Sequence, residues 1–138
     1  MSAKDKSKDM AYIHQVKYYE CDRMGVTHHS NYVRFMEEAR IDLLDRLGYG
    51  FEKMEAEGIV SPVISLSCNY RKPTTFKDNI EIEVSVSEIS VFKITLSYAM
   101  TVGGETVFTG NSVHCFTKDG KPLKIEESFP DLIPVRKM

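Results

Sequence analysis

A loop ahead of the most strongly helical segment carries the side chains best suited to chemistry. Asp22 lies eight residues before Ser30, where the helical pattern begins. A helix N-terminus offers unpaired backbone N–H groups and the positive end of the helix dipole, which can hold a developing oxyanion. A carboxylate facing those donors could act as a general base for water or as a nucleophile on an acyl carbon. The spacing is equally compatible with an Asx turn, in which Asp22 satisfies only its own loop.

Two adjacent histidines, His28 and His29, follow in the same loop. Neighbouring side chains point in different directions, and no third ligand lies at a metal-binding spacing, so no metal site is predicted. One imidazole could hydrogen-bond a substrate, or both could be surface side chains. Cys21 could serve as a nucleophile only beside a group that lowers its pKa, and a buried free thiol is the commoner state.

Charged side chains elsewhere offer weaker signals. Arg71, Lys72 and Lys118 could contact phosphates of a ligand, although such charges are more often solvated. Glu37 and Arg40, three residues apart, predict an exposed helix ion pair. The chain contains no GxSxG nucleophile elbow, Walker glycine loop or Rossmann fingerprint.

The elements that must position these residues are one helix and a set of strands. Apolar residues recur at helical spacing over residues 31–47, and Gly48 follows as a helix-terminating residue. Period-two alternation predicts strands over residues 64–71, 80–87, 93–102 and 107–117, preceded by a weaker strand over 12–19. Short turns make antiparallel neighbours. The prediction is an α+β domain in which a five-stranded antiparallel sheet curls around one long helix.

Composition and strand edges narrow the class of protein. The chain has 138 residues, 18 basic against 20 acidic side chains and 42% hydrophobic residues, enough for one domain over 11–138 after a polar tail at 1–10. A net charge of −2 leaves no footprint for nucleic acid, and no apolar run approaches a membrane span. Three cysteines without CxxC spacing and no apolar leader predict a cytoplasmic protein. Because open sheet edges are normally paired or covered, a homo-oligomer is predicted.

Two stretches carry a likeness to known proteins. The first reads Tyr18-Tyr19-Glu20-x-Asp22-x-x-Gly25-Val26-x-His28-His29-x-Asn31-Tyr32-x-x-Phe35-x-Glu37-x-Ala39-Arg40. The second reads Tyr70-Arg71-Lys72-Pro73 and is followed by Asp78. Together they resemble the signature of the hot-dog-fold acyl-CoA thioesterases, chiefly the 4-hydroxybenzoyl-CoA thioesterase type and its Tol–Pal-associated relatives.

The resemblance implies homodimers that often pair into homotetramers, with active sites at the subunit interface. It places the catalytic carboxylate on Asp22 and the oxyanion-binding backbone N–H on His29, while His28 stands where relatives commonly carry an aromatic residue. The substrate would be an acyl-CoA, or an acyl group on acyl carrier protein, with no cofactor beyond the CoA of the substrate. Residues expected to contact the substrate are His28, Tyr32, Tyr70, Arg71 and Lys72.

Other functions occur on the same fold. One alternative is a non-catalytic acyl-CoA-binding or regulatory module, and another is a dehydratase, whose motif the chain lacks. The acyl group would be lined by side chains such as Tyr32, Met36, Tyr70 and Phe108, and its identity stays open. So does the choice between a general-base route and an anhydride route for Asp22.

Overall fold

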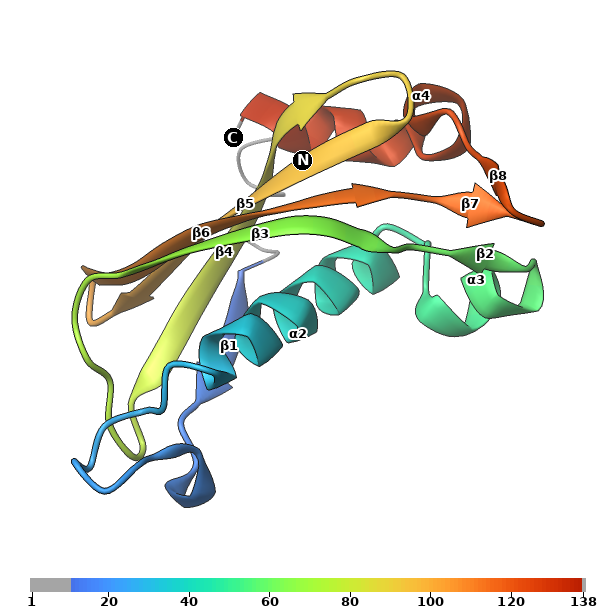
Figure 1. Cartoon of the computed structure of the whole chain (residues 1–138). Helices are drawn as coiled ribbons and strands as arrows, with labels where there is room; N and C mark the ends of the chain where they lie inside the picture. The colour runs from blue at the N-terminus through green and yellow to red at the C-terminus, as the bar shows by residue number, and fades with distance from the viewer. Residues whose placement is uncertain (1–10, 138) are drawn as a thin grey trace.

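The computed structural model describes residues 11–137, in which one long helix lies against one face of an antiparallel sheet (Figure 1). The predicted tail at residues 1–10 lies outside the described residues. Five strands form the sheet in the order β1-β4-β5-β6-β3, and every neighbouring pair is antiparallel. Their bounds are β1 (Tyr12–Gln15), β3 (Val63–Tyr70), β4 (Asn79–Ile89), β5 (Lys93–Val102) and β6 (Glu105–Cys115).

The remaining elements are short, apart from the central helix α2 (Asn31–Arg46). A small second sheet has the order β2-β7-β8. These elements are η1 (Tyr18–Glu20), α3 (Phe51–Ala56), β2 (Ile59–Val60), β7 (Thr117–Lys118), β8 (Lys121–Pro122), α4 (Ile125–Ser128) and η2 (Pro130–Lys137).

The core lies between α2 and the sheet. Phe35, Met36 and Leu43 from one stripe of the helix are buried, and so are Ile82 and Met100 on alternate positions of β4 and β5. Burying one aliphatic or aromatic side chain of this size stabilises the fold by about 1.5–3 kcal/mol. The contact between the two apolar faces therefore fixes the position of α2 on the sheet. The predicted α+β hot-dog fold is confirmed, with a five-stranded antiparallel sheet around one long helix.

Local boundaries differ from the prediction where the pattern was weak. The first strand ends at Gln15 instead of residue 19, and Tyr18–Glu20 forms a 3-10 turn. The strand predicted over 107–117 spans Glu105–Cys115, because the tight turn at Gly103 and Gly104 lets pairing begin at once. The segment after α2, for which the pattern predicts no element, contains α3.

Arg40 departs from the predicted exposed ion pair. Its side chain is only 9% exposed, and its Nη2 lies 4.0 Å from Oε1 of Glu37, which is 60% exposed. Arg40 lies on the flank of α2 that turns toward the sheet, where it lines a small cavity with Tyr98 and His114. The charge is therefore held inside the fold rather than in water.

The edge strand β3 keeps its apolar residues in solvent. Ile64, Leu66 and Tyr70 are 46%, 45% and 51% exposed, whereas alternate residues of β4 and β5 are buried. In the single chain β3 therefore has no buried apolar face, although its sequence alternates like that of β4 and β5. The strand pairs with β6 on one side only, which leaves its other edge open.

Gly110 sets how closely β6 approaches β3. A Cβ at Gly110 would lie 2.7 Å from the backbone oxygen of Ser67 and 2.9 Å from the ring of Phe108. Gly110→Ala should lower the free energy of unfolding by about 1–3 kcal/mol, because a backbone atom must move to make room. Urea unfolding measures this loss. Thr106→Ala, at an exposed position of the same strand, should change stability by less than about 0.5 kcal/mol, and an equal effect of the two substitutions would contradict the packing argument.

Candidate active site

The loop that holds Asp22 is a tight turn. The Asp22 N–H donates to the Val26 oxygen (2.9 Å), and the Gly25 N–H donates back to the Asp22 oxygen (3.0 Å). Gly25 has φ +78, a left-handed conformation that glycine adopts without strain. Oδ1 of Asp22 accepts the Met24 N–H at 2.8 Å, so the Asx-turn alternative is realised. Among residues 11–137, Oδ2 makes no hydrogen bond, which leaves it available to a substrate or water.

A second loop holds the first in place. The Thr27 N–H donates to the Thr74 oxygen (2.8 Å), and the Thr75 hydroxyl donates to the Gly25 oxygen (2.7 Å). Two residues before Asp22, the backbone oxygen of Glu20 accepts the His28 N–H (2.8 Å). The Asp22 turn is thus tied to neighbours on both sides, which a catalytic carboxylate needs in order to keep its position.

The two histidines do different things at the start of α2. Ser30 is the N-cap of α2, but its side chain makes no capping hydrogen bond. Nδ1 of His28 accepts the Ser30 N–H (3.2 Å), so this imidazole satisfies a donor at the helix start. The rings of His28 and His29 stack with centroids 4.3 Å apart. The His29 N–H has no hydrogen-bond partner within the described chain, whereas its carbonyl accepts the Tyr70 hydroxyl (3.2 Å). The His29 N–H is therefore a free donor at the positive end of a helix.

Asp22 and His29 open onto one pocket of about 320 Å³. Six of the seven residues expected to act on or bind a substrate line it, and His28 is the exception. The structure leaves the predicted role of His28 in substrate binding untested and assigns its side chain to the helix start. The lining residues are Asp22, Val26, Thr27, His29, Tyr32, Tyr70, Arg71, Lys72 and Pro73.

Two hydroxyl groups that no sequence motif marked, those of Thr27 and Thr74, support Tyr32 at the pocket. Thr74 Oγ1 lies 2.6 Å from Thr27 Oγ1 and 2.9 Å from the Tyr32 hydroxyl, and all three side chains are buried. Burial raises the pKa of Tyr32 above its ordinary value, so the phenol stays neutral and able to donate. These hydrogen bonds orient the ring of Tyr32. In the sequence, Pro73 just before Thr74 is the feature that indicates a turn at this position.

Glu20 anchors the loop from below. Its Oε1 accepts the Lys17 N–H (2.8 Å) and lies 2.8 Å from Nε2 of His14. Nδ1 of the same imidazole lies 3.3 Å from Oε1 of Glu38, and its ring stacks on Phe35 with centroids 4.1 Å apart. A buried histidine thus links the loop, the first strand and α2.

The basic side of the pocket comes from the end of β3. The N–H groups of Arg71 and Lys72 both donate to the Val107 oxygen (2.9 and 3.1 Å), which holds this segment against β6. Nζ of Lys72 pairs with the Glu105 carboxylate. Lys118, the third predicted phosphate contact, lies on β7 and lines a different cavity. Arg71 therefore provides the more available positive charge at this mouth.

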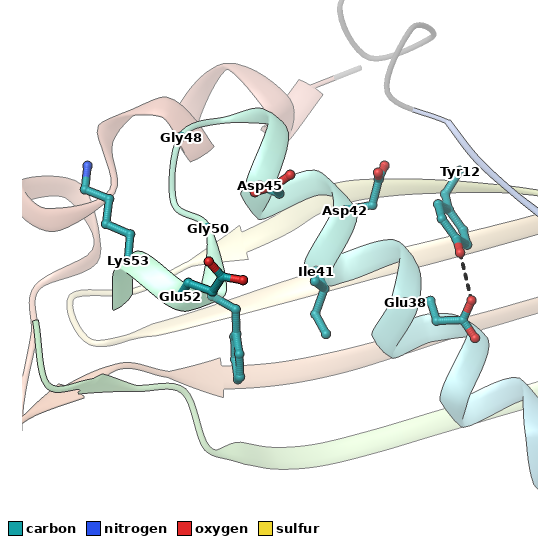
Figure 2. A pocket seen from close by; sticks show the side chains of 10 residues that line it. Tyr12, Glu38, Ile41, Asp42, Asp45, Gly48, Gly50, Glu52 and Lys53 are labelled. Atoms are coloured by element: carbon teal, nitrogen blue, oxygen red, sulfur yellow. Dashed lines mark hydrogen bonds between the residues drawn. The ribbon is translucent and has the colours of Figure 1, made fainter. Parts of the chain in front are cut away.

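A larger pocket of about 740 Å³ lies along the other flank of α2 (Figure 2). The Tyr12 hydroxyl donates to Oε1 of Glu38 (2.8 Å), and Figure 2 draws this bond in a pocket whose lining has three further carboxylates: Asp42, Asp45 and Glu52. Burial, reinforced by Glu38, raises the pKa of Tyr12 to about 12. This acidic lining would repel a phosphate-bearing ligand, and it includes none of the predicted site residues.

Within residues 11–137, no group of three or more His, Cys, Asp or Glu side chains is arranged to hold a metal ion. In the same part of the chain, no helix is long and apolar enough to cross a membrane.

Comparison with known proteins places these features in a family. An esterase-named protein of Aquifex aeolicus is 34% identical over 122 residues, covering 88% of this chain and 95% of that protein. YneP of Bacillus subtilis, named as an acyl-CoA thioesterase, is 32% identical over 120 residues and covers 85% and 87%. The structure of a DHNA-CoA thioesterase from Staphylococcus aureus is 31% identical, has a TM-score of 0.79 and covers 88% of this chain and 83% of that one.

A family model described as the thioesterase-like superfamily matches residues 16–132. That span contains the Asp22 turn, the start of α2 and the basic end of β3. With most of its length matched and its fold confirmed, the chain belongs to the thioesterase-like superfamily.

Proposed function

We propose that the protein hydrolyses an acyl-CoA thioester to the free acid and CoA. The observation that carries this proposal is the pairing of Asp22 with the free His29 N–H at one pocket. Thioester hydrolysis needs a donor for the carbonyl oxygen as it gains negative charge, and a carboxylate on the side from which attack comes. The superfamily and the names of its members support the same reaction class.

In the proposed reaction, the thioester oxygen accepts the His29 N–H at the start of α2. Asp22 then acts in one of two ways. As a general base, its free oxygen takes a proton from water while the water oxygen bonds to the carbonyl carbon. As a nucleophile, that oxygen bonds to the carbon itself, and water later cleaves the mixed anhydride. In both routes the C–S bond breaks, and CoA leaves as a thiolate that is then protonated.

The basic end of β3 supports CoA as the carrier of the acyl group. Arg71 and Lys72 line the same pocket as Asp22, and CoA carries several phosphate charges that guanidinium and ammonium groups attract. An acyl carrier protein would present the same thioester through a phosphopantetheine arm, and it is the alternative donor.

We also propose that the working form is a homodimer built on β3. The open edge of this strand and its exposed side chains, among them Ile64 and Leu66, are the kind of surface that a second copy covers. Tyr70 is on the same strand and lines the pocket, so a partner on β3 would lie beside the site.

Asp22→Asn tests the reaction. The amide cannot take a proton or attack a carbonyl, so the rate of thiol release from an acyl-CoA should fall by about 10²–10⁴-fold. Thiol release is followed with a chromogenic disulfide over a series of acyl-CoA chain lengths. Asp45→Asn, the same change at an exposed position in the larger pocket, should keep the parental rate. Near-parental turnover by Asp22→Asn would sink the assignment, and retained acyl-CoA binding with no turnover in either form would indicate a binding module.

Light scattering tests the dimer. The protein should have at least twice the mass of the 15.8 kDa chain. Ile64→Glu places two like charges near each other across a β3–β3 interface and should shift the population toward single chains. Val91→Glu, at an exposed position between β4 and β5, is the matched control and should leave the mass unchanged. A wild-type protein that is monomeric at micromolar concentration would refute the proposal.

A further inference from the structure

A buried polar cluster lies on the sheet face under α2, away from Asp22. The Tyr98 hydroxyl is 2.6 Å from Ser112 Oγ, and Ser112 Oγ is 2.6 Å from Nε2 of His114. All three residues are at most 3% exposed. Polar groups buried to this degree normally have every donor paired, because a donor that loses its hydrogen bonds to water without gaining another one destabilises the fold.

One atom of this cluster has no partner. Nδ1 of His114 is buried and makes no hydrogen bond within the described residues. If the Tyr98 hydroxyl donates to Ser112, and Ser112 donates to Nε2, every other donor is satisfied and Nδ1 carries the proton. Burial, with a smaller contribution from Arg40, lowers the pKa of His114 to about 4, so the ring is neutral near pH 7. The cluster is then left with one unused N–H donor.

Arg40 adds a second donor group to the same place. It lines the same cavity as Tyr98, Ser112 and His114, and its only ion-pair partner among the described residues is Glu37 at 4.0 Å. A guanidinium this buried is normally held by closer acceptors. The cavity measures about 80 Å³, room for a few heavy atoms when one water occupies about 30 Å³ of liquid. Glu37 also lines this cavity, but its side chain is 60% exposed. The buried groups that lack a close partner, Nδ1 of His114 and the Arg40 guanidinium, are donors, so the buried part of the cavity suits an oxygen.

The cavity and the candidate active site are neighbouring pockets along α2 and β3. Tyr32 and Tyr70 line the active-site pocket, while Met36 and Leu66, one turn further along the helix and four residues back along the strand, line the cavity. From Phe108, opposite Tyr70, to Ser112, opposite Leu66, β6 runs four residues, or about 13 Å. Three backbone bonds span about 3.5 Å in an extended chain. An extended acyl chain therefore needs about ten to eleven bonds to reach the level of Ser112, whose hydroxyl lies against His114.

We propose that this cavity receives the distal end of the acyl chain and that His114 selects chains bearing an oxygen acceptor about ten bonds from the thioester. The substrate class is thus a medium-chain acyl thioester with a hydroxyl, carbonyl or carboxylate group near its far end. An acyl group consisting of a single aromatic ring is too short to reach His114. This inference rests on the proposed thioesterase activity and specifies its substrate.

The test compares matched acyl-CoAs with the full-length protein. Decanoyl-CoA is the reference, and 10-hydroxydecanoyl-CoA and decanedioyl-CoA add an oxygen at the far end. The oxygenated substrates should have kcat/KM values about tenfold higher than decanoyl-CoA, because a hydrogen bond to a buried donor that otherwise has no partner strengthens binding by about that factor. Equal values for all three would overturn the proposal. Comparison of the two oxygenated substrates separates a neutral from an anionic acceptor.

His114→Gln identifies the residue responsible. Glutamine can keep a hydrogen bond to Ser112 while it removes the ring nitrogen Nδ1, so the variant should fold and still hydrolyse decanoyl-CoA. Its preference for oxygenated chains should fall by about tenfold. Ser97→Ala, which changes a side chain on the opposite face of β5 from Tyr98, should keep the wild-type preference. A preference that survives His114→Gln would overturn the role of His114.

The failure of the proposed function gives a different result. In that case no acyl-CoA is hydrolysed by the wild-type protein. Calorimetric titration with 10-hydroxydecanoate and decanoate then tests the cavity without turnover. Tighter binding of the hydroxy acid, lost in His114→Gln, would support the binding site, and equal binding of the two acids would overturn it.

Discussion

The structure depends on the burial of one sheet face by one helix. Strands β4, β5 and β6 present alternate apolar side chains, and α2 is the longest of the helices in residues 11–137 that could cover them. Phe35, Met36 and Leu43 fix the rotation and the position of the helix, because any shift along the sheet would expose them. The first turn of α2 is thereby held at the end of β3, where the Tyr70 hydroxyl meets the His29 carbonyl. The location of the helix N-terminus follows from the packing of the core.

The proposed chemistry uses what helix formation leaves over. The first N–H groups of a helix have no partner within it, and His28 accepts the one from Ser30. The His29 N–H, one residue before the N-cap, makes no hydrogen bond within residues 11–137. Asp22 lines the same pocket as His29, and hydrogen bonds to Thr74, Thr75 and Glu20 hold its loop in place. A flexible loop would lose the advantage of a fixed donor and a fixed carboxylate. The cavity under α2 likewise contains donors without close partners: among the described residues, Nδ1 of His114 makes no hydrogen bond, and the ion-pair partner of Arg40 is Glu37 at 4.0 Å.

Local sequence signals predicted the helix and the strands with strong alternation, and they failed where neighbours decide. The spacing of Tyr32, Met36 and Leu43 predicted a helix over residues 31–47, and the observed α2 ends one residue earlier, at Arg46. The weak alternation after Gln15 did not predict the 3-10 turn at Tyr18–Glu20. The helical pattern alone predicted an exposed Arg40, whose side chain is buried. Six of the seven predicted site residues line one pocket, because the fold brings together the two stretches on which they were placed, the loop with the helix start and the end of β3. Thr27 and Thr74 were missed because their contact joins two loops 47 residues apart.

The sequence by itself determined the element types, the family signature and the chemical groups available, because periodicity and side-chain chemistry are properties of the chain. Only the tertiary structure decided which of those groups meet. The register between β3 and β6 sets Tyr70 beside Phe108 and Leu66 beside Ser112, and a slip of one residue would turn every side chain of the strand to the other face. The partnerless Nδ1 of His114 likewise exists only because packing removes water from it without supplying an acceptor.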